Sequence, residues 1–96
     1  MGRELREVSH VQLVMFSSAF CEPCMQTRSV LQEAARLIPG ASFTDLDIVA
    51  HVADAETAGI QVTPTVLIRN AAGDEVFRAQ GAPSLNQVLV AAAKAL

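Results

Sequence analysis

The sequence predicts an α/β domain with a mixed four-stranded sheet and helices on both faces. The 96 residues are 51% hydrophobic, and a chain of this size buries one core rather than two. Apolar segments of strand length alternate with segments of helical periodicity in the order β-α-β-α-β-β-α. Gly and Pro residues lie between these segments and separate them. We therefore interpret residues 1–96 as one domain.

The first predicted strand and the first predicted helix lie on either side of a small polar turn. Val11 to Phe16 is an apolar run of strand length. The helix is expected to begin near Pro23, whose missing N–H would have no intrahelical partner in the first turn. It is expected to stop at Pro39-Gly40. Its apolar face consists of Thr27, Val30, Leu31, Ala34, Leu37 and Ile38.

Three further elements fill the middle of the chain. Ser42 to Asp47 alternates polar and apolar side chains, which is typical of a strand. Val52 to Ala58 has the features of a short helix that ends at Gly59. Thr65 to Ile68 is apolar and β-branched, as central strands are. Because helices connect these first strands, we expect parallel pairing through right-handed crossovers.

A hairpin and a helix are predicted for the end of the chain. Asn70-Ala71-Ala72-Gly73 supplies a turn, and Glu75 to Gln80 returns as the antiparallel partner strand. Ser84 and Gln87 have the spacing of a capping box at the start of the last helix. The apolar stripe of that helix consists of Leu85, Val88, Leu89, Ala92 and Leu96.

The distribution of charge excludes several classes of partner. Ten acidic and seven basic residues are scattered along the chain and give a net charge of −3. This charge offers no basic face for nucleic acid or anionic lipid. The longest apolar stretch near the N-terminus, Val11 to Phe16, is too short for a membrane span or the core of a signal peptide. We therefore expect a soluble, cytoplasmic protein, and its small Ala-rich elements favour a monomer.

Two cysteines are the candidate reactive residues of the sequence. Cys21 and Cys24 lie where the first strand ends and the helix begins. Unpaired N–H groups and the helix dipole favour the thiolate form of Cys21, so we expect it to be the nucleophile. Cys24 lies one turn further on and is expected to be the less exposed, resolving thiol. Because only two residues separate the cysteines, a mixed disulfide at Cys21 can be attacked intramolecularly and released.

Four segments, in chain order, resemble landmarks of the thioredoxin superfamily. Phe20-Cys21-Glu22-Pro23-Cys24 is similar to the aromatic-Cys-x-Pro-Cys active site of that family. Asp45-Leu46-Asp47 resembles the strand ending that follows, and Val62-Thr63-Pro64-Thr65 resembles the loop that carries a cis-proline. Gln80-Gly81-Ala82-Pro83-Ser84 resembles the last glycine turn. The resemblance covers nearly the whole chain and implies a thioredoxin fold.

The same resemblance implies how a substrate would bind. Pro64 would be cis and lie beside the dithiol, and the backbone of Thr63 would pair with a bound substrate strand. Gln80 stands where many thioredoxins carry an apolar residue, which indicates a different choice of partner. The implied groove consists of Phe20, Glu22, Pro23, Thr63, Pro64, Gly81 and Ala82.

One departure from the family pattern concerns proton transfer. Met15 stands where ordinary thioredoxins have a buried Asp that assists the resolving cysteine, and Phe43-Thr44-Asp45 lacks the usual Lys partner. Loss of both groups avoids an unpaired buried charge. It also removes the proton acceptor expected for Cys24. Glu22 is a candidate relay through water, although its negative charge opposes thiolate formation at Cys21.

These features predict a thiol-disulfide oxidoreductase that reduces disulfides in proteins. It would need no bound cofactor and would receive electrons from a separate reductase, which is typically flavin-dependent in the family. A glutaredoxin-like, glutathione-dependent enzyme is a second hypothesis, less favoured because Gly81-Ala82 resembles the thioredoxin turn. A third is a binding module with a regulatory disulfide. The two histidines, His10 and His51, lie on different segments without ligand spacing, so no metal site is predicted.

Overall fold

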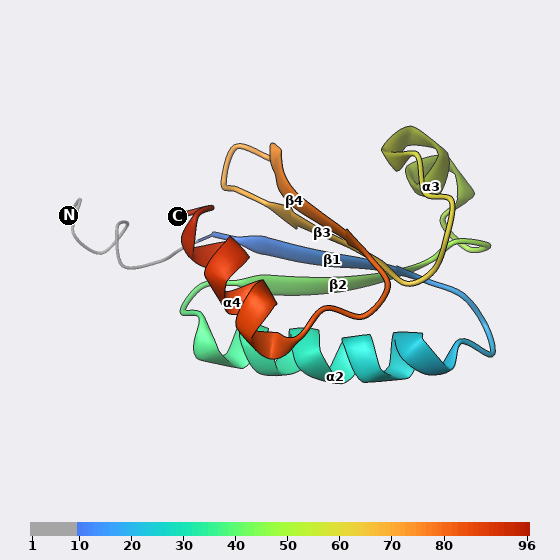
Figure 1. Cartoon of the computed structure of the whole chain (residues 1–96). Coiled ribbons are helices and arrows are strands. Elements are labelled where there is room, and N and C mark those ends of the chain that lie inside the picture. The colour runs from blue at the N-terminus through green and yellow to red at the C-terminus, as the bar shows by residue number, and fades with distance from the viewer. Residues whose placement is uncertain (1–9) are drawn as a thin grey trace.

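The computed structural model of the protein describes residues 10–96, and this part of the chain forms four strands and three helices (Figure 1). Their order confirms the predicted sequence of elements. Residues 1–9 of the predicted domain lie outside the described residues. The elements are β1 (Gln12–Ser17), α2 (Glu22–Leu37), β2 (Ser42–Asp47), α3 (Val52–Ala58), β3 (Thr65–Arg69), β4 (Glu75–Gln80) and α4 (Leu85–Ala93).

The strands form one mixed sheet in the order β2-β1-β3-β4. β1 and β2 are parallel, as predicted, and α2 connects them. The expectation of parallel pairing is wrong for β3, which runs antiparallel to both β1 and β4. The reason lies in α3, whose seven residues make a helix about 10 Å long. A strand of six residues is about 20 Å long, so α3 does not carry the chain back along the sheet.

Because β3 is reversed, its start lies at the same edge of the sheet as the ends of β1 and β2. α3 lies beyond that edge (Figure 1), and β3 begins where β1 and β2 end. In the register, Thr65 at the start of β3 pairs with Phe16, while Asp47 at the end of β2 pairs with Ser17. The segment before β3 therefore lies next to the segment after β1.

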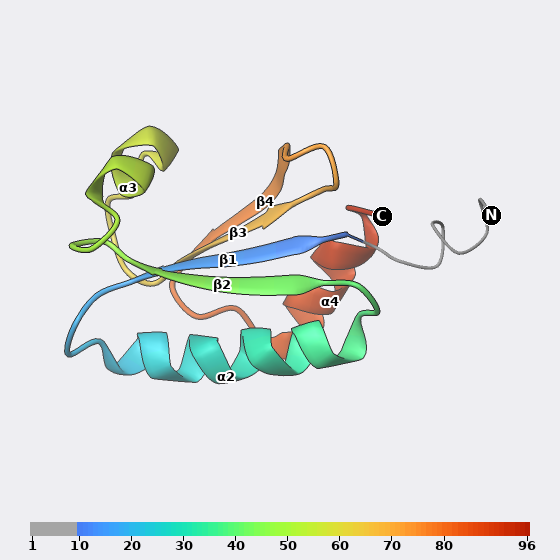
Figure 2. The same ribbon diagram turned by 180° about the vertical axis from the view of Figure 1, so that it is seen from behind.

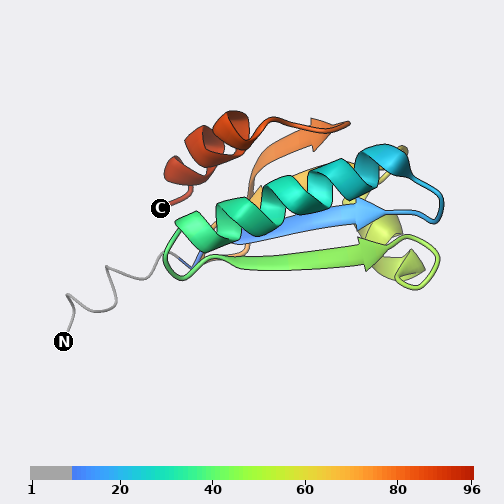
Figure 3. The ribbon, with the colours of Figure 1, turned by 90° about the horizontal axis from the view of Figure 1, so that it is seen from below.

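The helices cover both faces of the sheet, as predicted. α2 and α4 lie on one face in both opposed views (Figure 1 and Figure 2), and the view from below shows them next to one another (Figure 3). α3 packs against the other face through Ala55, which contacts a smaller cluster formed by Val14, Phe16 and Leu67. Because side chains alternate along a strand, neighbouring residues of β1 supply two separate cores.

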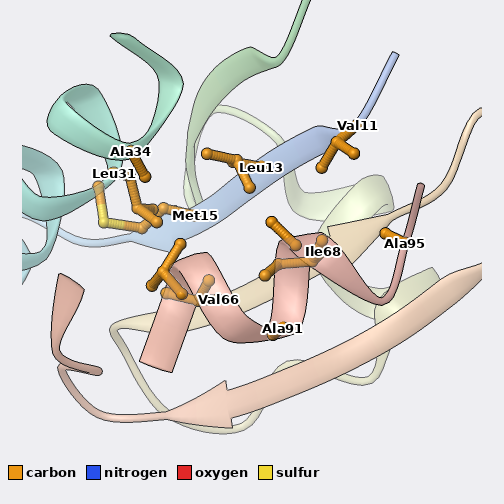
Figure 4. Close-up of a cluster of buried hydrophobic side chains, with 11 residues drawn as sticks. Val11, Leu13, Met15, Leu31, Ala34, Val66, Ile68, Ala91 and Ala95 are labelled. Carbon is orange, nitrogen blue, oxygen red and sulfur yellow. The ribbon is translucent and has the colours of Figure 1, made fainter. Parts of the chain in front are cut away.

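The larger core lies between the sheet and the two helices α2 and α4. Figure 4 shows side chains from β1, β3, α2 and α4 meeting there. Met15 and Leu31 are fully buried in it. The complete buried set is Val11, Leu13, Met15, Leu31, Ala34, Val66, Ile68, Val88, Ala91, Ala92 and Ala95.

Local caps fix where the helices begin. At α4 the Ser84 hydroxyl accepts the Gln87 backbone N–H at 3.1 Å, and the Gln87 side chain accepts the Ser84 N–H at 2.8 Å. This reciprocal pair confirms the predicted capping box. At α2 the N-cap is Cys21, whose sulfur accepts the backbone N–H of Cys24. The reactive pair is therefore part of the helix start itself.

Two apolar side chains expected on helix faces lie at the surface instead. α4 ends at Ala93, and the N–H groups of Lys94 and Ala95 bond to carbonyls three residues earlier. This tighter final turn brings Ala95 into the core and leaves Leu96 77% exposed. At the end of α2, the chain leaves the helix at Ile38, which packs on the core. Leu37 is 45% exposed.

An ion pair on β4 gives a pH-dependent prediction. Arg78 donates to the Glu75 carboxylate at 2.8 and 2.9 Å and to the Ala58 carbonyl at 2.7 Å, which ties β4 to the end of α3. The hydrogen bond from Arg78 lowers the pKa of Glu75. The contribution of the pair is therefore present above the ordinary Glu pKa and is lost as pH falls through the lowered value.

We expect Arg78→Ala to lower the free energy of unfolding by about 0.5–1 kcal/mol at pH 7, since the pair is largely exposed. The loss should be smaller at acidic pH, once the pH has fallen through the lowered pKa of Glu75 and the carboxyl is protonated. Urea unfolding of both proteins at the two pH values measures this difference. Arg36→Ala, which breaks a more exposed pair with Glu33, is the matched control and should cost less. Equal losses from Arg78→Ala at both pH values would contradict the prediction.

Candidate active site

The two cysteines form a disulfide at the junction of β1 and α2. Their sulfur atoms are 2.12 Å apart, and their Cα atoms are 5.2 Å apart. Cys21 is partly exposed, whereas Cys24 is 1% exposed. The pair thus has the location and the difference in exposure that the sequence predicts.

The helix start surrounds Cys21 with backbone donors. The Cys24 N–H lies 3.2 Å from the Cys21 sulfur, and the N–H groups of Cys24 and Met25 also approach the Cys21 carbonyl. In the reduced protein, the Cys24 N–H and the helix dipole favour negative charge on the Cys21 sulfur. Glu22, in the first turn of the helix, is exposed and opposes that effect with its own charge.

The segment before β3 lies at the same edge of the sheet. The Thr63–Pro64 peptide bond is cis, and Pro64 is fully buried. The Thr63 hydroxyl lies 2.7 Å from the Ser18 hydroxyl, just after β1. The Pro64 carbonyl accepts the N–H of Gly81 at 2.8 Å, and Gly81 has a φ of 94° that other residues rarely adopt. These bonds tie the proline loop to both neighbouring segments.

A cavity of about 500 Å³ opens beside the disulfide. Of the residues that the resemblance placed in a groove, Phe20 and Glu22 line this cavity, whereas Pro23, Thr63, Pro64, Gly81 and Ala82 do not. One of its lining residues, Arg28, also forms an ion pair with Asp45 of β2. The full lining is Ser18, Phe20, Cys21, Glu22, Cys24, Met25 and Arg28.

Phe20 presents a large apolar surface directly before the dithiol. Its side chain is fully exposed, and Met25 on the first turns of α2 is 64% exposed. The backbone of Phe20 has a φ of 57°, a left-handed conformation that costs a bulky residue of order 1 kcal/mol. Such strain persists where the surrounding structure imposes it, and it occurs often at functional sites.

The sequence did not indicate a set of hydrogen-bonded polar side chains that joins β1, β2 and α2 next to the site. The Ser17 hydroxyl donates to Oδ1 of Asp45 at 2.6 Å, and Nε of Arg28 donates to Oδ2 at 2.7 Å. The spacing along α2 could have indicated the position of Arg28. It follows Cys24 by four residues and so lies on the same helix face. Alternation along β2 places Asp45 on the side of Phe43, which packs on the α2 core.

Met15, which stands where ordinary thioredoxins have a buried Asp, is part of the apolar core. Met15 is 0% exposed and lies in the core next to α2, and Phe43 packs against the same core. Within residues 10–96, no three side chains of His, Cys, Asp or Glu are grouped so as to hold a metal ion. No helix in the described part of the chain is long and apolar enough to cross a membrane.

The sheet order, the three helices and the dithiol at the start of α2 together define a thioredoxin-fold protein with a Cys-x-x-Cys disulfide. The family model described as Thioredoxin matches residues 2–94. The chain therefore belongs to the thioredoxin family. A search of curated proteins found no match.

Solved structures of thioredoxins are similar to this chain. A mutant thioredoxin from Halobacterium salinarum has a TM-score of 0.81 at 22% identity, over 97% of this chain and 83% of that one. A reduced thioredoxin pre-protein from Schistosoma mansoni has a TM-score of 0.79 at 22% identity, over 97% and 85%. The Fasciola hepatica thioredoxin has a TM-score of 0.74 at 22% identity, over 93% of this chain and 86% of that one. At these identities, the similarity shows the fold.

Proposed function

We propose that the protein reduces disulfides in other proteins through the Cys21–Cys24 dithiol. The observation that carries this proposal is the pairing of a partly exposed cysteine at a helix start with a buried cysteine one turn later. Membership of the thioredoxin family supports thiol-disulfide chemistry. Reduction of protein disulfides is the direction that we propose.

In the proposed reaction, the Cys21 thiolate attacks one sulfur of the partner's disulfide. A mixed disulfide forms, and the other partner sulfur leaves as a thiolate that takes up a proton. The Cys24 thiol then loses its proton and attacks the Cys21 sulfur. The Cys21–Cys24 disulfide forms, the partner's second thiolate leaves, and two electrons have moved to the partner. A separate reductase returns the protein to the dithiol.

The surface around the disulfide supports a polypeptide as substrate. The exposed Phe20 and Met25 offer apolar contact beside the sulfurs. The backbone at Thr63, before the cis Pro64, is where a partner strand would pair. We propose that Phe20, Thr63, Pro64, Gly81 and Ala82 contact the partner.

The equilibrium reduction potential of the dithiol tests this function. We expect a value near or below about −250 mV in a dithiothreitol redox buffer, which is the range of reducing thioredoxins. A potential in this range lets the dithiol pass electrons to protein disulfides of higher potential. A value near or above about −200 mV would contradict the proposal and favour glutaredoxin-like exchange or oxidation. Absence of a reversible couple would favour the binding-module alternative.

A further inference from the structure

The cavity beside the dithiol carries a cation that has no role in the reaction described above. Arg28 lines the cavity together with Cys21 and Cys24. Arg28 and Cys24 are four residues apart in α2, so their side chains lie on the same face. Helical side chains lean toward the N-terminus of their helix. We therefore expect the side chain of Arg28 to lean toward the turn that holds Cys24, in agreement with the cavity that both residues line.

Arg28 is held in place by its neighbours rather than free in solvent. Its Nε donates to Asp45 at 2.7 Å, and Ser17 holds the other oxygen of that carboxylate at 2.6 Å. The side chains of Arg28 and Asp45 are 37% and 28% exposed. The Nη groups of Arg28 have no hydrogen-bond partner among residues 10–96. They are available to an anion in the cavity.

Among residues 10–96, Arg28 is the one cation that lines the cavity with Cys24. Cys24 is 1% exposed, and burial without a compensating charge disfavours an anion. β1 and residues 62–64 contain no ionisable side chain. Glu22, the other charge on the cavity, opposes a thiolate. On β2, Asp47 is occupied by the N–H groups of residues 49 and 50.

We propose that Arg28, positioned by Asp45, stabilises the thiolate of Cys24 in the step that releases the partner. In this step the Cys24 thiol gives its proton to water in the open cavity, and its sulfur attacks Cys21. The guanidinium is a positioning and electrostatic group that forms no bond to sulfur. Asp45 holds the guanidinium and offsets part of its charge. This inference rests on the proposed function, because it describes the second half of the same exchange.

The test is a titration of Cys24 as a single thiol. In a Cys21→Ser background, the ultraviolet absorbance of the Cys24 thiolate is followed against pH. We expect Arg28→Gln to raise the titration midpoint by roughly 0.5 pH unit, since a cation is lost and Asp45 is left unpaired. Asp45→Asn should lower the midpoint by a similar amount. The double variant should return close to the parent.

The two variants are expected to shift the Cys24 titration midpoint in opposite directions, and this difference distinguishes an electrostatic role of Arg28 from a structural one. Loss of a purely structural ion pair would move the midpoint in the same direction for Arg28→Gln and Asp45→Asn, and that result would overturn the inference. Arg36→Gln removes the same charge two turns further along α2, where Arg36 pairs with Glu33. This control should leave the midpoint unchanged. Equal effects of Arg28→Gln and Arg36→Gln would also overturn the inference.

A conservative variant and the choice of readout complete the design. Arg28→Lys keeps the charge and should leave the midpoint within about 0.2 of the parent; a shift as large as that of Arg28→Gln would contradict an electrostatic role. The titration needs no substrate. If the expected shifts occur while wild-type protein fails to reduce insulin, the proposed function is wrong and the electrostatic role of Arg28 stands. If reduction succeeds without the shifts, the inference about Arg28 is wrong.

Discussion

Replacing Cys21 by Ser is expected to reduce catalysed turnover of a protein disulfide to the uncatalysed background. A serine hydroxyl is not ionised at neutral pH and does not attack disulfides. Cys24 does not replace Cys21 as nucleophile, because it is 1% exposed and a bulky partner disulfide needs access. Insulin reduction with dithiothreitol as electron donor measures the turnover. If the Cys21→Ser variant turns over at the wild-type rate, the mechanism is wrong.

The matched control is Cys24→Ser, which replaces the sulfur of the second cysteine by oxygen. Cys21 keeps its place at the helix start, so the first attack still occurs. The resolving attack is lost, and we expect a mixed disulfide between Cys21 and the partner to accumulate in stoichiometric amounts. Mass spectrometry under non-reducing conditions detects it. Accumulation with Cys21→Ser instead would reverse the assignment of the two cysteines.

The second large effect is expected from Met15→Asp. Met15 is fully buried between β1 and α2, and Phe43, which packs on the same core, offers no positive charge. An unpaired carboxylate there should lower the free energy of unfolding by about 3–5 kcal/mol. A domain of this size has only about 5–15 kcal/mol in total. Urea unfolding at pH 7 measures the loss.

Met15→Leu is the control, because it changes the shape of the side chain without adding charge and should cost less than about 1.5 kcal/mol. The effect of Met15→Asp should also depend on pH. Burial raises the pKa of the introduced carboxyl in the folded state above its unfolded value, near 3.9. The cost is therefore smallest at low pH, where the carboxyl is protonated in both states, and grows as pH rises. A cost as small as that of Met15→Leu at pH 7 would show that the core accommodates the charge.

Much of the local structure was predictable from short stretches of sequence. The capping box of Ser84 and Gln87, the helix start around Pro23 and the hairpin near Gly73 each depend on residues within one or two turns of one another. Periodicity placed the strands to within one residue. The dithiol was predictable for the same reason, because a strand end, two cysteines and a helix start are consecutive in the chain.

The arrangement around the dithiol was less predictable. The cis Pro64 followed only from the resemblance, since most X-Pro bonds are trans. The cavity lining was partly missed, because the resemblance indicated the residues around Pro64 and Gly81, whereas the residues that line the cavity lie between Ser18 and Arg28. Arg28 and Asp45, 17 residues apart, belong to different elements, and each has the features of an ordinary surface residue in the sequence.

The sequence by itself determined the order of the elements, their caps and the position of the cysteines, because these depend on interactions between residues close together in the chain. Tertiary structure alone decided the direction of β3, the burial of Ala95 in place of Leu96, and the meeting of Ser17, Asp45 and Arg28 beside Cys24. Each of these depends on how separate elements pack. A short α3 reverses β3, and a tightened last turn moves Ala95 inward. The pairing of β1 with β2 beneath α2 joins three polar side chains that the sequence keeps apart.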